Sequence, residues 1–234
     1  MNTSNSYRNE VIPVNKIIQT ESSRKNMPAQ EFESCSRRIK VCTLGRFSLS
    51  IDGKPLSFSG KAQQKPLDLL KALIAFGSRN VPEEQLTNVL WPESDRDSAH
   101  QSLAATLFRL RELLGIRDAV FLRDGKLTLD SEYVYVDVWA FERLLSLADL
   151  ADALSQKEDN IKIVDMAMSL YKGSFMKGET GKTWHVSMRE RLRIKLFRHI
   201  KGVCSYLESI ERHDKALCLY QKVPRQLSNP VVNK

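Results

Sequence analysis

The chain has 234 residues, of which 42% are hydrophobic and 27% charged, so it can bury a core and differs from a disordered chain. No apolar run reaches the roughly 18 residues of a membrane helix, and no signal-peptide pattern opens the chain. We therefore expect a cytoplasmic protein with no membrane partner. The net charge of +8 favours an anionic partner such as nucleic acid, yet residues 37–135 carry only 15 basic against 12 acidic groups.

Residues 1–36 are rich in Ser, Asn and Gln, show no sustained period and are predicted to be a disordered tail. Apolar and polar residues then alternate over 39–42 and 46–51, as they do in half-buried strands. Asp52 and Gly53 give a hairpin turn signal, and residues 54–58 are expected to return as a third strand. The domain thus begins with a small antiparallel sheet.

Three helical patterns follow the sheet. Pro66 suits the first turn of a helix that Gly77 ends. Its apolar stripe consists of Leu69, Leu70, Leu73 and Ile74. A second helix is expected over 83–90, with acidic residues in its first turn, where the helix dipole favours them. The third is expected from about residue 98 to residue 114, with Gly115 as its C-cap.

A second hairpin, over 121–129, is predicted to turn at Asp124 and Gly125. Beyond Val136 the apolar spacing becomes helical, and antiparallel helix pairs of this kind suggest a helical-repeat stack. Pro224 breaks the last helical pattern, so residues 224–234 are expected to be a tail. The predicted fold is an α+β winged helix-turn-helix domain over 37–135, followed by an all-α, TPR-like domain over 136–223.

The third helix carries the functional signal. Its leucines follow i, i+4, i+7, i+11 spacing and must face the core: Leu103, Leu107, Leu110 and Leu114. The opposite face carries Gln101, Ala105, Arg109 and Glu112, with Ser102 nearby and with Thr106 and Arg111 flanking the stripe. Arg can bond a guanine edge, Gln an adenine edge, and Ser or Thr can reach bases or phosphates, so this face suits a major groove.

The alternative is an ordinary amphipathic surface helix, in which Ser98 and Gln101 form a capping box. Context favours the DNA interpretation, because the helix follows a short helix and a turn, as a recognition helix does. The hairpin after it carries Arg123 and Lys126 at its tip, where such a wing can contact phosphates or a minor groove.

The chain resembles the SARP-type bacterial regulators, whose winged-helix domain is related to OmpR-type DNA-binding domains. The resemblance to that domain rests on residues 44–55, 86–92 and 108–115. The resemblance to the bacterial transcriptional activator domain that follows it rests on residues 136–141, 170–175, 184, 190–192 and 213–217. Together these motifs span about residues 38–223.

The resemblance implies a transcriptional activator that binds direct repeats near promoters, recruits RNA polymerase and can self-associate on DNA. The helix positions that match the family's DNA contacts are Gln101, Ser102, Ala105, Thr106, Arg109 and Arg111. Arg109 is the expected base contact and Arg111 the expected phosphate contact, while Arg123 and Lys126 match the wing. The chain departs from the family by lacking the aromatic residue that many relatives carry in the wing, and its C-terminal domain is shorter.

The most basic stretch of the chain can be interpreted in two ways. It comprises Arg189, Arg191, Arg193, Lys195, Arg198 and Lys201. It is either a solvated helix face whose stems cover apolar surface or a contact for DNA phosphates or an acidic partner. No nucleophile or metal motif is evident, so we expect neither an enzyme nor a cofactor. The alternative function is a protein-interaction module that acts through its helical repeats.

Overall fold

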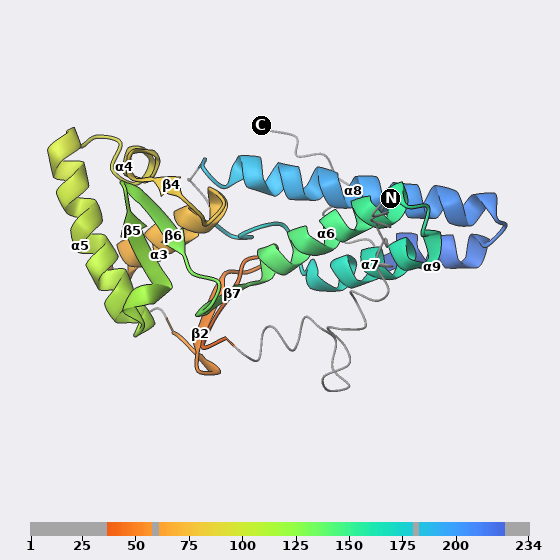
Figure 1. The fold of residues 1–234 in the computed structure, drawn as a ribbon, viewed down its shortest axis with the longest axis horizontal. Coiled ribbons are helices and arrows are strands. Elements are labelled where there is room, and N and C mark those ends of the chain that lie inside the picture. The colour runs from red at the N-terminus through yellow and green to blue at the C-terminus, as the bar shows by residue number, and fades with distance from the viewer. Residues whose placement is uncertain (1–36, 58–60, 180–182, 223–234) are drawn as a thin grey trace, which may run out of the picture.

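A computed structural model describes residues 37–57, 61–179 and 183–222 (Figure 1). The tails predicted at 1–36 and 224–234, and Phe58 of the predicted third strand, lie outside the described residues. A four-stranded sheet has the order β3-β2-β1-β7, and a three-stranded sheet has the order β4-β6-β5. The strands are β1 (Ile39–Cys42), β2 (Ser48–Ile51), β3 (Lys54–Pro55), β4 (Val81–Pro82), β5 (Val120–Arg123), β6 (Lys126–Leu129) and β7 (Val134–Val136).

The predicted hairpin turns are confirmed. Asp52 (φ 47°) and Gly53 (φ 77°) adopt the left-handed conformation that joins β1–β2 to the short β3. The third strand is shorter than predicted and ends at Pro55, although the N–H of Leu56 still donates to the carbonyl of Leu49 at 2.9 Å. The structure also contains β7, a strand that was not predicted from the sequence. It pairs parallel with β1, in the register Val41 opposite Val136.

Helices make up the rest of the described chain. They are α3 (Lys61–Ala75), α4 (Glu83–Leu90), α5 (Arg96–Leu114), the 3-10 turn η1 (Arg117–Ala119), α6 (Asp137–Ala153), α7 (Lys157–Leu170), α8 (Val186–Ser209) and α9 (His213–Lys222). The leucine and isoleucine stripe predicted for α3 is buried. Pro66 was expected in the first turn of this helix. However, α3 begins at Lys61, so Pro66 lies inside the helix, where its missing N–H removes one main-chain hydrogen bond.

The start of α5 differs from the capping-box alternative. Its N-cap is Asp95, whose side chain accepts a hydrogen bond from the N–H of Ser98 at 3.0 Å. Ser98 therefore lies one turn inside the helix, and Gln101 is exposed rather than engaged in a cap. The predicted C-cap is confirmed, because Gly115 has φ 67° and its N–H bonds to the carbonyl of Arg111 at 3.0 Å.

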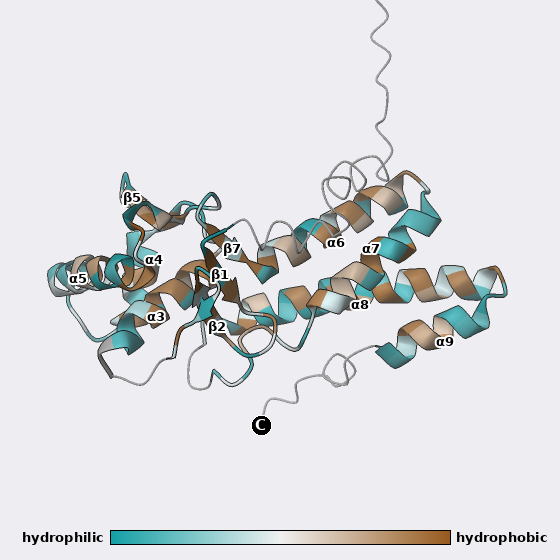
Figure 2. Ribbon diagram, turned by 90° about the horizontal axis from the view of Figure 1, so that it is seen from below, coloured by the Kyte–Doolittle hydropathy of each residue, from teal (hydrophilic) through white to brown (hydrophobic). Residues whose placement is uncertain are grey.

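The second half of the described chain is helical. The helices α6 and α7 pack together, α8 packs on α7 and on α6, and α9 folds back on α8. Their apolar stripes face inward, and the apolar strands of the sheet abut the start of α6 (Figure 2). Within the ranges described, no helix is both long and apolar enough to cross a membrane.

A buried carboxylate joins the sheet to the helical part. Asp137 is the first residue of α6 and is 7% exposed. It accepts hydrogen bonds from the N–H of Thr43 (2.8 Å), the hydroxyl of Thr43 (2.7 Å) and the N–H of Leu44 (2.9 Å). Burial raises the pKa of Asp137, and the hydrogen bonds from Thr43 and Leu44 oppose that rise.

The loop after α7 completes this junction with main-chain hydrogen bonds. Gly45 N–H donates to the carbonyl of Ser174 at 3.2 Å, and Met176 N–H donates to that of Thr43 at 2.7 Å. The indole N–H of Trp139 in α6 also donates to the hydroxyl of Ser78, which follows α3, at 3.0 Å. Segments far apart in the sequence are therefore fixed to one another by directional bonds.

We expect Asp137→Asn to lower the free energy of unfolding by about 2–3 kcal/mol, because an amide nitrogen in place of either carboxylate oxygen faces the N–H of Thr43 instead of accepting a hydrogen bond from it. Urea denaturation would measure the loss. The matched control is Asp118→Asn, which makes the same change at an exposed position. Equal stability of the two variants would contradict the role assigned to Asp137.

Candidate nucleic-acid interface

One face of α5 is fixed in the core. The predicted leucine stripe is confirmed, since all four leucines are at most 4% exposed: Leu103, Leu107, Leu110 and Leu114. This face packs mainly against α3 and also against α4. Because the buried stripe sets the rotation of the helix about its axis, the other face must point outward.

The outward face of α5 carries four of the six contacts predicted on this helix. Gln101, Ala105 and Arg109 are exposed and lie one helical turn apart, and Ser102 beside them is half-buried. The structure adds two exposed residues that the sequence reading did not select, Ala104 and Phe108. Their signal was present in the helical period, because both lie three or four positions from a predicted contact.

Two residues that were predicted to contact DNA, Thr106 and Arg111, are not fully exposed. Thr106 is only 4% exposed, so the protein itself covers the side chain that was expected to reach DNA. Arg111 is half-buried and donates its Nε–H to the carbonyl of Val120 at 2.8 Å, which joins α5 to the first strand of the hairpin. The Nε–H of Arg111 therefore serves the fold, and the expected phosphate contact of Arg111 stays a prediction that would use its other guanidinium nitrogens.

The hairpin β5–β6 lies beside α5 (Figure 1). Arg123 and Lys126 are exposed and flank the turn at Asp124 (φ 50°) and Gly125 (φ 67°). The tip is held in place because Glu83 at the start of α4 donates its N–H to the carbonyl of Gly125 at 2.9 Å. Two exposed cations thus flank a supported turn of a hairpin that lies beside α5.

The electrostatics of this surface are mixed. Glu112 and Asp124 are exposed on the same two elements, and the imidazole Nδ1 of His100 lies 2.9 Å from a carboxylate oxygen of Glu83. The arrangement can offer hydrogen-bond donors and acceptors, small apolar groups and two flanking cations. Over the part of the chain that the structure describes, no group of three or more His, Cys, Asp or Glu side chains could hold a metal ion.

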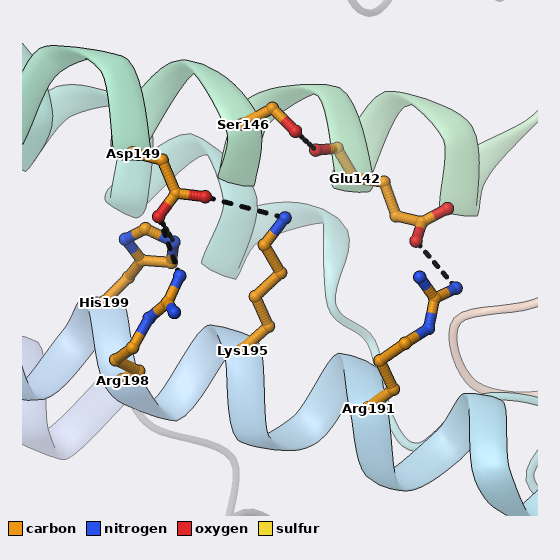
Figure 3. Close-up of polar contacts among 7 residues, drawn as sticks. All are labelled: Glu142, Ser146, Asp149, Arg191, Lys195, Arg198 and His199. Atoms are coloured by element: carbon orange, nitrogen blue, oxygen red, sulfur yellow. Dashed lines mark hydrogen bonds and ion pairs between the residues drawn. The ribbon is translucent and has the colours of Figure 1, made fainter.

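The basic stretch of α8 pairs largely with the protein itself (Figure 3). Arg191 contacts Glu142 of α6 at 2.9 Å, and Arg198 contacts Asp149 of α6 at 2.7 Å. Lys195 lies 3.6 Å from the other oxygen of Asp149. Arg189 donates to the carbonyls of Phe175 and Met176, at 3.0 and 3.2 Å. These contacts favour a structural role for the stretch over a phosphate contact.

A buried histidine lies within this set of charges. The side chain of His199 is 6% exposed, and its Nε2 is 3.3 Å from Asp149. Desolvation lowers the pKa of His199, and Asp149 and Asp152 oppose that effect while Arg198 and Lys195 add to it. The position of the imidazole on α8, where it faces α6, therefore disfavours its protonated form.

Comparisons with known proteins place these features in context. The family model of the bacterial transcriptional activator domain matches residues 136–228. Among solved structures, the chain is similar to Mycobacterium tuberculosis EmbR in complex with a low affinity phosphopeptide. The identity is 19% and the TM-score 0.58, over 82% of this chain and 52% of that chain, so the likeness concerns the fold and the present chain spans about half of that protein's length. No curated protein matches the sequence.

We expect Arg111→Ala to lower the free energy of unfolding by about 1–2 kcal/mol, because it removes a charge-assisted hydrogen bond between α5 and the hairpin. Arg109→Ala, the matched control two positions earlier on the same helix, should change stability by no more than about 0.5 kcal/mol because its side chain is exposed. Urea titrations that give the same midpoint for both variants would refute this assignment.

A second expectation concerns pH. Because the pKa of His199 is lowered in the folded state, the unfolded chain binds a proton below about pH 6.5 that the folded chain does not take up. Stability should therefore fall as the pH drops from 7.5 to 5.5, and His199→Gln should make that fall shallower by up to about 1.4 kcal/mol per pH unit. The control is His213→Gln, at an exposed position; a slope that only this control changes would argue against His199.

Proposed function

We propose that the chain is a sequence-specific DNA-binding transcriptional regulator, and that α5 is its recognition helix. The observation that carries the proposal is the outward face of α5, where Gln101 and Arg109 are exposed, together with the exposed cations Arg123 and Lys126 on the hairpin that lies beside α5. In this proposal residues 37–135 form a winged helix-turn-helix domain, and residues 136–223 form a TPR-like activator domain.

The chemistry of the face suits a major groove. Arg109 can donate two hydrogen bonds to a guanine edge, Gln101 can bond an adenine edge, and the small Ala105 allows close approach. Arg123 and Lys126 are placed to contact phosphates or a minor groove, which would fix the orientation of the domain on the duplex. Because the surface also carries Glu112 and Asp124, base contacts rather than charge alone must supply much of the selectivity.

The helical part supports the regulatory half of the proposal. Residues 136–228 match an activator domain, and we propose that it contacts RNA polymerase while α5 holds the protein on direct repeats near a promoter. Copies on such repeats would associate head to tail rather than about a two-fold axis. The second candidate function is a protein-interaction module that uses the exposed apolar residues Ile194 and Phe197 of α8 without activating transcription itself.

The test is selection of binding sites by the purified full chain from a random duplex library at fixed moderate salt, followed by footprinting. We expect discrete, regularly spaced repeats. Arg109→Ala should weaken binding to the selected site about ten- to a hundredfold, because it removes a bidentate base contact. Arg212→Ala removes the same charge beside Glu158, far from α5 in the sequence, and should leave the affinity within about twofold.

The opposite result is binding that is diffuse, strongly salt-dependent and equal in the parent and Arg109→Ala, which would rule out α5 as a reading helix. Transcription from a template that carries the selected site, with purified RNA polymerase, then separates the two candidate functions. Higher transcript yield supports an activator. Tight DNA binding with no change in transcript, together with capture of a protein partner, supports the interaction module.

A further inference from the structure

Phe108 has an unusual position on α5. Its side chain is 53% exposed, although large aromatic side chains account for much of the apolar area that proteins bury. The neighbouring Leu107 and Leu110 are at most 4% exposed, so the helix cannot rotate Phe108 inward without pulling leucines from the core. The fold therefore presents an aromatic ring on the same outward face as Gln101 and Arg109.

On its N-terminal side, Phe108 has small, apolar neighbours. Ala104 lies one turn before it on the same face and Ala105 lies beside Ala104, and both are exposed. Neither residue can cover the ring, and both leave room for another surface to approach it. Polar groups border this apolar strip, since Gln101 precedes it and Arg109 and Glu112 follow it.

The chemistry of this strip identifies what it would contact. In the major groove, base edges present hydrogen-bond donors and acceptors and one apolar group, which is the 5-methyl group of thymine. An aromatic ring has no hydrogen bond to offer a base edge, but it packs well against a methyl group. We propose, on the basis of the function proposed above, that Phe108 determines specificity by packing against a thymine 5-methyl group, next to the bases that Arg109 and Gln101 read.

Replacing thymine by uracil removes the methyl group alone and so isolates this contact. A duplex selected by the full chain is remade with uracil at each thymine in turn, and affinities are measured for the parent and for Phe108→Ala. The parent should lose about three- to fivefold at one position, as burial of a single methyl group predicts. Phe108→Ala should bind the original duplex correspondingly more weakly and should not distinguish thymine from uracil at that position.

Two further variants make the result specific. Phe108→Leu keeps an apolar side chain and should retain part of the preference for thymine. Tyr220→Ala removes an aromatic ring that is 46% exposed on α9, and should keep the full preference. Circular dichroism checks that each variant is folded, which is expected because both positions are exposed and Ala favours helix.

The outcomes separate this inference from the function on which it rests. If no sequence is enriched, the proposed function fails and the inference fails with it. If discrete sites are found and Phe108→Ala still prefers thymine to uracil by the same factor as the parent, only the role of Phe108 is overturned. The role of Phe108 would also be overturned if the selected site has no thymine next to the bases whose protection is lost in Arg109→Ala.

Discussion

The hydrogen bonds accepted by one buried carboxylate, that of Asp137, determine how the two parts of the chain are joined. A buried charge is tolerated only when its oxygens are bonded, and here the N–H groups of Thr43 and Leu44 and the Thr43 hydroxyl meet that need. Those donors directly follow β1, whereas Asp137 begins α6. The direction in which the helical part leaves the sheet therefore follows from this contact.

The arginines of the chain show that position in the fold, more than residue type, decides what a cation does. Arg109 and Arg111 are two residues apart on α5, yet one points outward and the other holds the hairpin through the carbonyl of Val120. On α8, Arg191 and Arg198 face carboxylates of α6 and join two helices. The donors of a guanidinium satisfy a main-chain carbonyl or a carboxylate as readily as a phosphate.

Features set by local periodicity were predictable from the sequence. The leucine stripe of α5, the hairpin turn at Asp124 and the glycine that ends α5 depend on residues close together in the chain. The parallel pairing of β7 with β1 was missed, because three residues carry little periodic signal and the partner strand is about 95 positions away. The contact of Arg111 with Val120 was missed for a related reason, because it depends on where the hairpin packs.

Because α8 is long and its first turns are held at the junction, its far end lies at a fixed distance from the sheet. Its 24 residues span about 36 Å, and its first turns are held by Arg189 at the carbonyls of Phe175 and Met176. The turn between α8 and α9 lies at the opposite end of the molecule from α5 (Figure 1). If α5 occupies a major groove, the side of the duplex on which that distant turn lies is fixed by the position of the binding site. Moving a binding site by half a helical repeat, about five base pairs, would then place the turn between α8 and α9 on the opposite side of the DNA.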